Sequence, residues 1–377
     1  MATKDQSHYR VRSAATHRGR VVLGIGELEG WCARLLTAAG FSGDHARLVA
    51  AALVDAEARG VSSHGIARVG IYVERLQGGL LNSTAQPWII KETEASAHVD
   101  ADNAVGHVGA RFGLRTAIGK ARSQGAGTAI VRHSNHCGAL GYFVREGAEQ
   151  GLITIAATNG PPVMAYYGGR TRAVGTNPIA FGVPRSGDFP LTLDMATSAT
   201  ARGKIILAGQ DGTRIPEGWA VDVEGRPTTD PGEALEGAVV PFAGPKGSGL
   251  AMMIDLICGG LAAAITGERI GDMYEDWDRE QWVSHFLLVL DPDAWLGGEA
   301  FRAHVAGFAE RVHELPQAEG SEYVHLPGEV EERAYRTARE AGVVFGGRVF
   351  ADLAAMGDRL GVTTPEVHDV ASPPVQS

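Results

Sequence analysis

Residues 128–158 read TAIVRHSNHCGALGYFVREGAEQGLITIAAT. Two runs rich in β-branched residues enclose a tight loop and a segment with helical spacing that stops at Gly151. This order of strand, loop, helix and strand predicts a mixed α/β (α+β) domain. Ser134, Asn135 and His136 come just before the helix, whose N-terminus points backbone N–H groups at a ligand, so an anion or a polar ring fits there. On local pattern alone, a purely structural loop remains open.

Further β-branched runs extend this domain on both sides, namely AHVDA, PIAFGV, PLTLDM and HFLLVLDP. The chain before and after them has helical spacing instead. We therefore expect a discontinuous helical domain, residues 25–94 and 296–362, with a sheet domain of residues 95–295 inserted into it. Residues 1–24 and 363–377 are expected to be a disordered extension and a disordered tail.

Composition excludes several classes of function. The formal net charge is −10 and no Lys or Arg cluster is present, which argues against a nucleic-acid partner but leaves small anionic ligands open. The longest apolar run, residues 249–265, contains Asp255 and two adjacent glycines, so we interpret it as a buried core helix and expect no membrane partner.

The three cysteines, Cys32, Cys137 and Cys258, form no CxxC pair, which predicts neither a disulfide nor a thiolate zinc site. They suit a reducing compartment, and we expect a cytoplasmic protein. An alternative is organelle targeting through residues 1–22, which are rich in Lys and Arg and poor in acids.

The stretch RVVLGIGELEGW, residues 20–31, imitates the glycine loop of a dinucleotide fold. Its spacing is GxGxxxG, and a second helical segment follows where a βαβ unit needs its second strand. We therefore expect no Rossmann domain here.

The stretch GVSSHGIARVGIY, residues 60–72, predicts a helix capped by Ser62 or Ser63, with His64 in its first turn. Arg68 and Tyr72 follow at helical spacing on the same side. The helix start and Arg68 should lower the pKa of His64, and the Arg68 guanidinium suits a carboxylate. This arrangement indicates a 2-oxo acid or 2-hydroxy acid site. On spacing alone, a capped surface helix with an incidental histidine remains open.

Other stretches carry weaker signals. His133, His136 and Cys137 suggest metal ligands, but no further ligands follow at a typical spacing, so we expect no metal. The loop around Lys246 precedes a helix, as phosphate sites do, without being a P-loop. A metal-dependent hydrolase and a non-catalytic dinucleotide-binding protein therefore stay as rival functions.

Six motifs appear in order: SSHGIARVGIY, SNHCGALGYF, GTNPIAFGVP, LDMATSATARGK, PFAGPKGSGLA and HLPGE. With them, residues 28–342 resemble the malate and L-lactate dehydrogenase family of the second type. The resemblance implies the L-sulfolactate dehydrogenase-like fold, which is not Rossmann and has a largely antiparallel central sheet. It also implies a homodimer that binds NAD(P)H, with NADH and NADPH undecided, and an active site between the sheet and the helical domain.

The resemblance also assigns roles to residues. His64 would be the proton donor to the substrate carbonyl, with Ser63 as its relay neighbour. Substrate contacts would come from Arg68, Thr176, Arg202 and Gly203. Cofactor contacts would come from His136, Cys137, Gly138, Ala139, Leu140, Asp194, Met195, Ala196, Pro245, Lys246, Leu326, Pro327, Gly328 and Glu329.

Lys204 stands where a cyclic-imine reductase branch of the family has an aspartate. A lysine there would stabilise a developing alkoxide or hold a carboxylate, and it would repel an iminium cation. We therefore expect reversible hydride transfer between NAD(P)H and C2 of a small 2-oxo acid, with reduction of a cyclic imine as the alternative.

Overall fold

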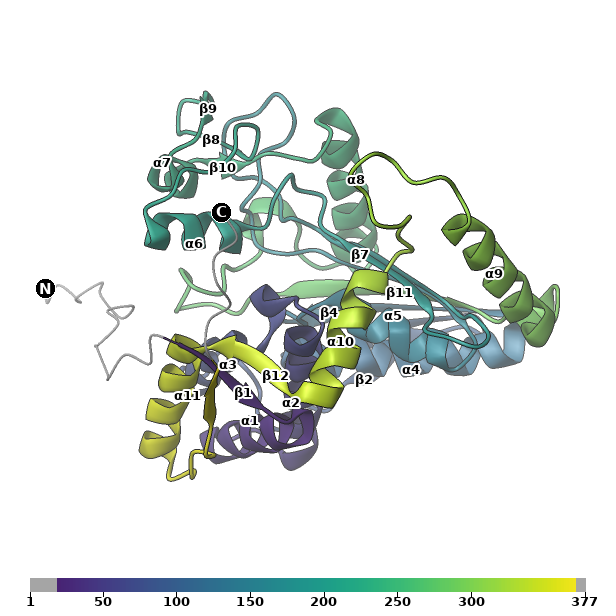
Figure 1. Ribbon diagram of the computed structural model, residues 1–377, viewed down its shortest axis with the longest axis horizontal. Helices are drawn as coiled ribbons and strands as arrows, with labels where there is room; N and C mark the ends of the chain where they lie inside the picture. The colour runs from purple at the N-terminus through teal and green to yellow at the C-terminus, as the bar shows by residue number, and fades with distance from the viewer. Residues whose placement is uncertain (1–18, 371–377) are drawn as a thin grey trace, which may run out of the picture.

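A seven-stranded sheet forms the centre of the computed structural model, which describes residues 19–370 (Figure 1). The strand order is β2 (Trp88–Glu92), β3 (Ser96–Asp100), β4 (Ala126–Ser134), β11 (Val283–Leu290), β5 (Ile153–Thr158), β6 (Ile179–Val183) and β7 (Leu191–Met195). Within this sheet only β3 and β4 run parallel, and every other neighbouring pair is antiparallel. The predicted largely antiparallel central sheet is confirmed.

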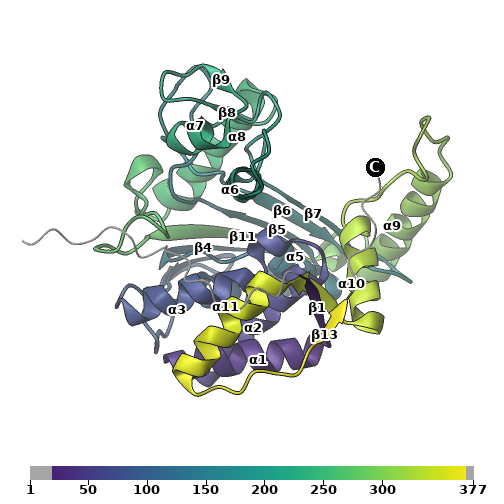
Figure 2. The same cartoon turned by 60° about the vertical axis from the view of Figure 1, so that its left-hand side comes forward.

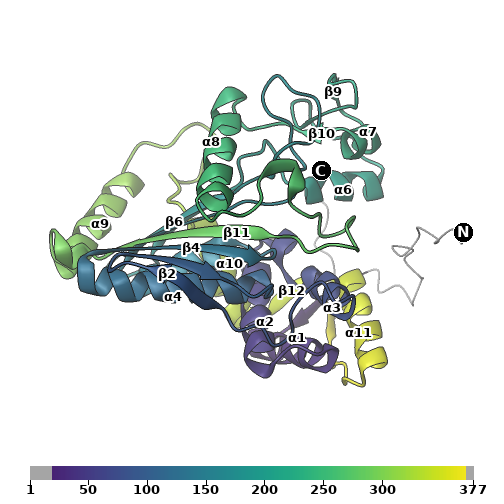
Figure 3. The ribbon, with the colours of Figure 1, turned by 180° about the vertical axis from the view of Figure 1, so that it is seen from behind.

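Helices cover both faces of this sheet (Figures 1 and 3). Helices α4 (Gly106–Gln124) and α5 (Leu140–Glu149) pack on one face, where Leu114 and Phe143 share a core with Val131 and Leu287. On the other face lies α8 (Pro245–Asp255), continued by the π-helical turn η3 (Leu256–Gly260).

The run of residues 249–265 is not the buried core helix that its composition predicts. Ile254 and Cys258 pack against the sheet, whereas Leu256 is 53% and Leu261 68% exposed. The run is apolar on all sides, and the sheet covers only one of them. Among residues 19–370, no helix combines the length and the apolar content that a membrane span requires.

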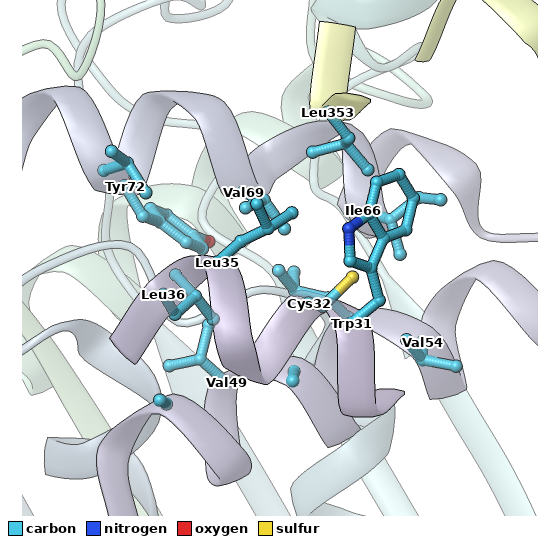
Figure 4. Packing of buried hydrophobic residues seen from close by; sticks show 14 of the residues in the cluster. Trp31, Cys32, Leu35, Leu36, Val49, Val54, Ile66, Val69, Tyr72 and Leu353 are labelled. Carbon is cyan, nitrogen blue, oxygen red and sulfur yellow. The ribbon is translucent and has the colours of Figure 1, made fainter. Parts of the chain in front are cut away.

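The helical part of the molecule joins the two ends of the chain around one core (Figures 2 and 4). Its helices are α1 (Ile25–Ala39), α2 (Gly43–Ala58), α3 (Val69–Gln77), α10 (Glu329–Ala341) and α11 (Gly347–Leu360). The Trp31 and Phe350 rings, with centroids 5.5 Å apart, connect α1 to α11. The Ser42 hydroxyl accepts from His45 N at 3.3 Å and caps α2, and Gly40 at φ 118° ends α1.

The expected disorder at both ends is wrong where the structure describes these ends. Strand β1 (Arg20–Leu23) pairs antiparallel with β12 (Val343–Gly346) on one side and with β13 (His368–Val370) on the other. Backbone pairing over a few residues leaves little trace in composition, which explains the miss. Residues 1–18 and 371–377 lie outside the described residues.

Two further parts of the chain differ from expectation. Helix α9 (Gly298–His313), predicted to belong to the helical domain, contributes no described residue to that core. It lies beside the sheet, apart from the helices of that core (Figures 1 and 2). An unpredicted lobe has its own small core and consists of α6 (Arg202–Asp211), β8 (Ala220–Val221), β9 (Pro227–Thr228), α7 (Pro231–Glu236) and β10 (Ala238–Val239).

The glycine stretch after β1 belongs to no Rossmann unit, as predicted. Gly24 precedes α1 directly, α1 leads into α2, and β1 pairs only with antiparallel neighbours among the described strands. A βαβ unit would need a parallel second strand at this point.

Candidate active site

A cavity of about 360 Å³ lies where the helical core meets the sheet. Its wall takes side chains from α2 and from the segment before α3, together with residues that follow β4, β5 and β7. This is the place that the family resemblance implies for the active site.

His64 stands on a short irregular segment instead of the first turn of one helix. Residues Ser62–His64 and Ile66–Arg68 form two 3₁₀ turns, and α3 begins only at Val69. Gly65 between the turns is extended, and the buried Glu57 carboxylate accepts a hydrogen bond from Ile66 N at 3.1 Å. A Cβ on Gly65 would overlap Glu57 Oε2, so a larger residue would displace the carboxylate that accepts from Ile66 N. This carboxylate replaces the helical hydrogen bonding that we predicted.

Hydrogen bonds nevertheless bring His64 and Arg68 together. Arg68 Nε donates to Ser63 O at 2.7 Å, and Ser63 Oγ lies 2.9 Å from His64 Nδ1. Burial, followed by the charge of Arg68, lowers the pKa of His64 to about 4. The direction agrees with the sequence prediction, but burial is the main cause and the helix start is absent. His64 is therefore neutral at physiological pH.

A second histidine supports the ring of His64. The His136 ring stacks on the His64 ring with centroids 5.5 Å apart, and Tyr72 Oη lies 2.7 Å from His136 Nδ1. Burial and the neighbouring His64 hold the pKa of His136 well below its ordinary value. Tyr72, predicted on the same side as His64 and Arg68, does not line the cavity. Its hydroxyl group instead holds the His136 ring in place through this hydrogen bond.

The N-terminus of α5 is already occupied by a carboxylate of the protein. Asp194, at the end of β7, accepts from Gly141 N at 2.7 Å, and burial raises the pKa of Asp194 to about 6. The sequence predicted a ligand anion or ring at this N-terminus. A ligand anion would therefore meet the carboxyl group of Asp194 there, although Asp194 itself lines the cavity.

The second predicted arginine, Arg202, is held by acids beside the cavity. Arg202 Nη2 lies 3.1 Å from Glu275 Oε1, and Nη1 lies 3.7 Å from Asp272 Oδ2. The Arg68 guanidinium lies 5.6 Å from the centroid of the Tyr274 ring. Arg68, Arg202, Asp272 and Tyr274 all line the cavity, which places two cations at its His64 end.

No group of three His, Cys, Asp or Glu side chains suited to a metal occurs among residues 19–370. Burial raises the pKa of the Cys137 thiol to about 12, so this thiol stays neutral. His133 turns to Asp100 and Glu280, at 3.1 and 3.0 Å. Cys137 and His133 therefore do not combine with His136 as metal ligands.

Most predicted site residues meet at the cavity. Those that line it are Ser63, His64, Arg68, His136, Cys137, Gly138, Ala139, Leu140, Thr176, Asp194, Ala196, Arg202, Gly203 and Gly328. Those that do not line it are Met195, Lys204, Pro245, Lys246, Leu326, Pro327 and Glu329.

The position of Lys204 does not support the catalytic role predicted for it. Lys204 is exposed on α6, while its neighbours Arg202 and Gly203 reach the cavity wall. Successive residues of a helix point in different directions, so adjacency in a motif does not place a side chain in the site.

Glu329 supports the cavity wall without touching the cavity. Burial alone would raise its pKa, but hydrogen bonds from Leu326 N, His313 and Arg333 lower the pKa of Glu329 to about 2. The turn that it stabilises presents Gly328, where a Cβ would lie 2.9 Å from Thr192 O. Glu329 thus has a structural role, and the cofactor contact predicted for it stays a prediction.

The sequence prediction missed the charged end of the cavity. Asp55, Arg59 and Arg145 line it together with Glu331 and Glu332. These residues come from α2, α5 and α10, which are distant in sequence. Within each helix alone, their pattern is that of an ordinary solvent-exposed face. What the sequence does offer is their position next to recognised motifs. Asp55 and Arg59 precede SSHGIARVGIY, Arg145 follows SNHCGALGYF, and Glu331 and Glu332 follow HLPGE.

Comparison with known proteins identifies the family. The family model described as Malate/L-lactate dehydrogenase matches residues 24–354. This chain belongs to that family. It is 37% identical over 308 residues to ureidoglycolate dehydrogenase (NAD(+)) of Escherichia coli, covering 82% of this chain and 88% of that protein. It is 34% identical to Delta(1)-pyrroline-2-carboxylate reductase of Ancylobacter novellus, covering 90% and 98% of the two chains.

Solved structures confirm the fold. The sulfolactate dehydrogenase of Methanocaldococcus jannaschii superposes with a TM-score of 0.84 at 33% identity, covering 91% of this chain and 98% of that one. Malate dehydrogenase of Pyrococcus horikoshii gives a TM-score of 0.85 at 30% identity, covering 94% and 99%. The predicted family and the predicted class of NAD(P)-dependent dehydrogenase acting on 2-hydroxy acids are both confirmed.

The residues present fit the nicotinamide cofactor of this family. Gly138, Gly141, Gly160, Gly203 and Gly328 all line the cavity, and without side chains they let the backbone approach a flat ring closely. Besides His64, charged residues of α2 and α10 line the same cavity, which therefore offers both sets of groups to one ligand.

Proposed function

We propose that this enzyme interconverts a small 2-oxo acid and its 2-hydroxy acid, with His64 as the group that moves the proton. The observation that carries the proposal is the placement of His64 and Arg68 on one cavity wall, 2.9 and 2.7 Å from atoms of the same residue, Ser63. NAD(P)H, when bound, supplies the hydride to C2. His64 gives a proton to the carbonyl oxygen in reduction and takes it back in oxidation.

The protonation state of His64 suits both directions. The free enzyme holds His64 neutral, as a base that can accept the hydroxyl proton of a 2-hydroxy acid. A substrate carboxylate held by Arg68 would offset the charge that helps to lower the pKa of His64, so the pKa rises when a 2-oxo acid binds. Because Ser63 Oγ engages Nδ1, Nε2 is the nitrogen assigned to proton exchange.

Arg68 favours an oxo acid over an imine. It lines the cavity beside His64, where its charge would repel a cationic iminium substrate, while the charge of Arg202 is already offset by Glu275 and Asp272. The substrate carboxylate is assigned to Arg68. The rest of the substrate is assigned to Thr176, Arg202 and Gly203. Because Asp272 and Glu275 already offset the charge of Arg202, the substrate group bound there should be polar and carry little charge.

One assay tests this proposal. NADH and NADPH are each mixed with the enzyme and a panel of 2-oxo acids, including oxaloacetate, pyruvate, sulfopyruvate and oxalurate, and with Δ1-pyrroline-2-carboxylate. Loss of the nicotinamide absorbance with an oxo acid supports the proposal. Turnover with the imine alone would assign the enzyme to the cyclic-imine reductases of the family. Absence of turnover with every compound would refute the proposed chemistry.

The proposal includes a homodimer in the cytoplasm. Support for a second copy comes from the apolar surface of α8 and η3, called here the apolar face, which leaves Met252, Met253, Leu256, Ile257 and Leu261 between 40% and 68% exposed. Patches of this kind mark protein interfaces. Support for the cytoplasm comes from the three free, buried cysteines, which suit a reducing compartment.

A further inference from the structure

A cluster of charged side chains forms part of the cavity wall and is called here the charged corner. It consists of Asp55 and Arg59 on α2, Arg145 on α5, and Glu331 and Glu332 on α10, all of which line the cavity. Ion pairs join most of these residues across α2, α5 and α10, whereas the hydrogen bonds of His64 and Arg68 run to Ser63. The charged corner therefore forms a set of contacts of its own on the wall of the same cavity.

Both guanidinium groups of the charged corner are already held by carboxylates. Arg59 lies 3.0 Å from Asp55 Oδ1 and 3.0 Å from Glu332 Oε2, and Arg145 pairs with the other oxygen of Asp55. The side chains of Arg59 and Arg145 are each only 9% exposed. Desolvated pairs of this kind are costly to break, so neither arginine is available to a phosphate group.

Carboxylates outnumber cations on the cavity wall of the charged corner. Asp55, Glu331 and Glu332 oppose Arg59 and Arg145, and Glu331 takes part in none of the ion pairs found among the described residues. Arg336 pairs with Glu332 at 2.9 Å and with Asp188, which also pairs with Arg185, but none of Arg185, Asp188 and Arg336 lines the cavity. Among the residues that line the charged corner the carboxylates exceed the cations by one, so a phosphate entering it would meet a wall of net negative charge.

An apolar surface adjoins the charged corner. Phe189 and Pro190 line the same cavity, and the Arg185 guanidinium lies 4.6 Å from the centroid of the Phe189 ring. Arg336, the partner of Glu332, lies 5.9 Å from the same ring, which places Phe189 beside α10. Such a surface suits a flat purine base, which would then lie beside the carboxylates.

We propose that the charged corner binds the hydroxyl groups of the adenosine ribose and excludes a 2′-phosphate, so that the enzyme uses NADH in preference to NADPH. Carboxylates accept hydrogen bonds from ribose hydroxyls, whereas a phosphate monoester would be repelled by them. This inference rests on the proposed function, because it requires that the nicotinamide end of the same dinucleotide lies at His64.

The test is a titration of the enzyme with NADH and with NADPH, followed by nucleotide fluorescence in the absence of substrate. We expect NADH to bind at least about tenfold more tightly, the ratio that corresponds to one unfavourable charge contact. Glu331→Gln removes one carboxylate without breaking an ion pair of the charged corner. It should reduce the preference for NADH over NADPH several-fold, mainly because NADPH binds more tightly to the variant. Glu340→Gln, an exposed position on the same helix, removes the same charge away from the cavity and should leave the ratio unchanged.

The outcomes separate this inference from the function on which it rests. Equal binding of the two nucleotides, or tighter binding of NADPH, would overturn the inference and leave the dehydrogenase intact. An unchanged ratio in Glu331→Gln would remove the charged corner as the cause of the preference. Failure of both nucleotides to bind would instead contradict the proposed function itself.

Discussion

At the scale of single residues, the charge on His64 controls the chemistry. Burial and Arg68 together lower its pKa to about 4, so His64 loses its proton as pH rises through that value and is neutral above it. Oxidation of a hydroxy acid needs this neutral form. We therefore predict that kcat/KM for oxidation stays level on the acid side of neutrality and falls only as pH approaches about 4.

Replacing Arg68 with glutamine tests the origin of this pKa. Arg68→Gln removes one of the two causes of the lowered pKa, so the acid limb of the pH profile should move to higher pH. The KM for the acid should rise roughly 10- to 100-fold, because a charge-assisted hydrogen bond to the carboxylate is lost.

The control for this variant is Arg202→Gln, since Arg202 is not among the causes of the His64 shift. It should raise KM without moving the acid limb. A limb that stays in place in Arg68→Gln, as measured by initial rates across pH, would show that Arg68 does not set the pKa of His64.

Residues inside motifs were predictable, and residues between motifs were not. His64, Arg68, His136 and Asp194 belong to local patterns with a chemical meaning, and all of them line the cavity. The charged corner depends on three helices meeting, which spacing along one helix does not reveal. Lys204 shows the opposite error. It belongs to a motif from which other residues reach the cavity, but its own side chain is exposed and does not line the cavity.

At the scale of elements, the segment between α2 and α3 is the part on which the site most depends. Gly65→Ala would drive its Cβ into Glu57 Oε2 and displace the carboxylate that holds Ile66 N. We predict a loss of about 1–3 kcal/mol of unfolding free energy, the usual effect of overpacking, together with most of the turnover. Urea denaturation and initial rates measure the two effects.

Gly70→Ala is the matched control for this prediction. Gly70 lies on α3, and a methyl group added there would meet only Met356 Cε, at 3.8 Å, so alanine fits. It should stabilise the helix by roughly 0.5–1 kcal/mol. Equal effects of the two alanines would mean that the contact with Glu57 does not shape this segment.

Elements with a strong local pattern were the ones that the sequence predicted. Strands β4, β5, β6, β7 and β11 follow β-branched runs, and α5 follows helical spacing with a glycine stop. The short strands β8, β9 and β10 offered no such pattern, since two residues define no period. Helix α9 was expected from its spacing, but spacing does not say which core a helix joins.

At the scale of the whole molecule, the apolar face of α8 and η3 predicts the assembly. We predict that the enzyme sediments as a dimer and that Leu256→Gln with Leu261→Gln shifts it toward monomer, because both side chains are more than half exposed in one chain. Leu315→Gln, a change at an equally exposed position beyond α9, should leave the dimer intact. A monomeric parent enzyme at all concentrations would contradict this assignment.

Whole-molecule features were the hardest to predict from sequence. The antiparallel sheet and its helical partner came from the family resemblance, and the structure confirms them. Strand β13 and the exposure of the apolar face depend on what each segment meets after folding, which composition does not record.

His64→Ala, measured for both turnover and nucleotide binding, tests the proposed chemistry at its centre. Positioned proton transfer contributes about 10² to 10⁴ in rate, so kcat should fall by about that factor with the best oxo acid. Binding of NADH, which we assign to other residues of the cavity, should stay within a few-fold of the parent enzyme. Turnover within a few-fold of the parent would show that His64 is not the proton-transfer group.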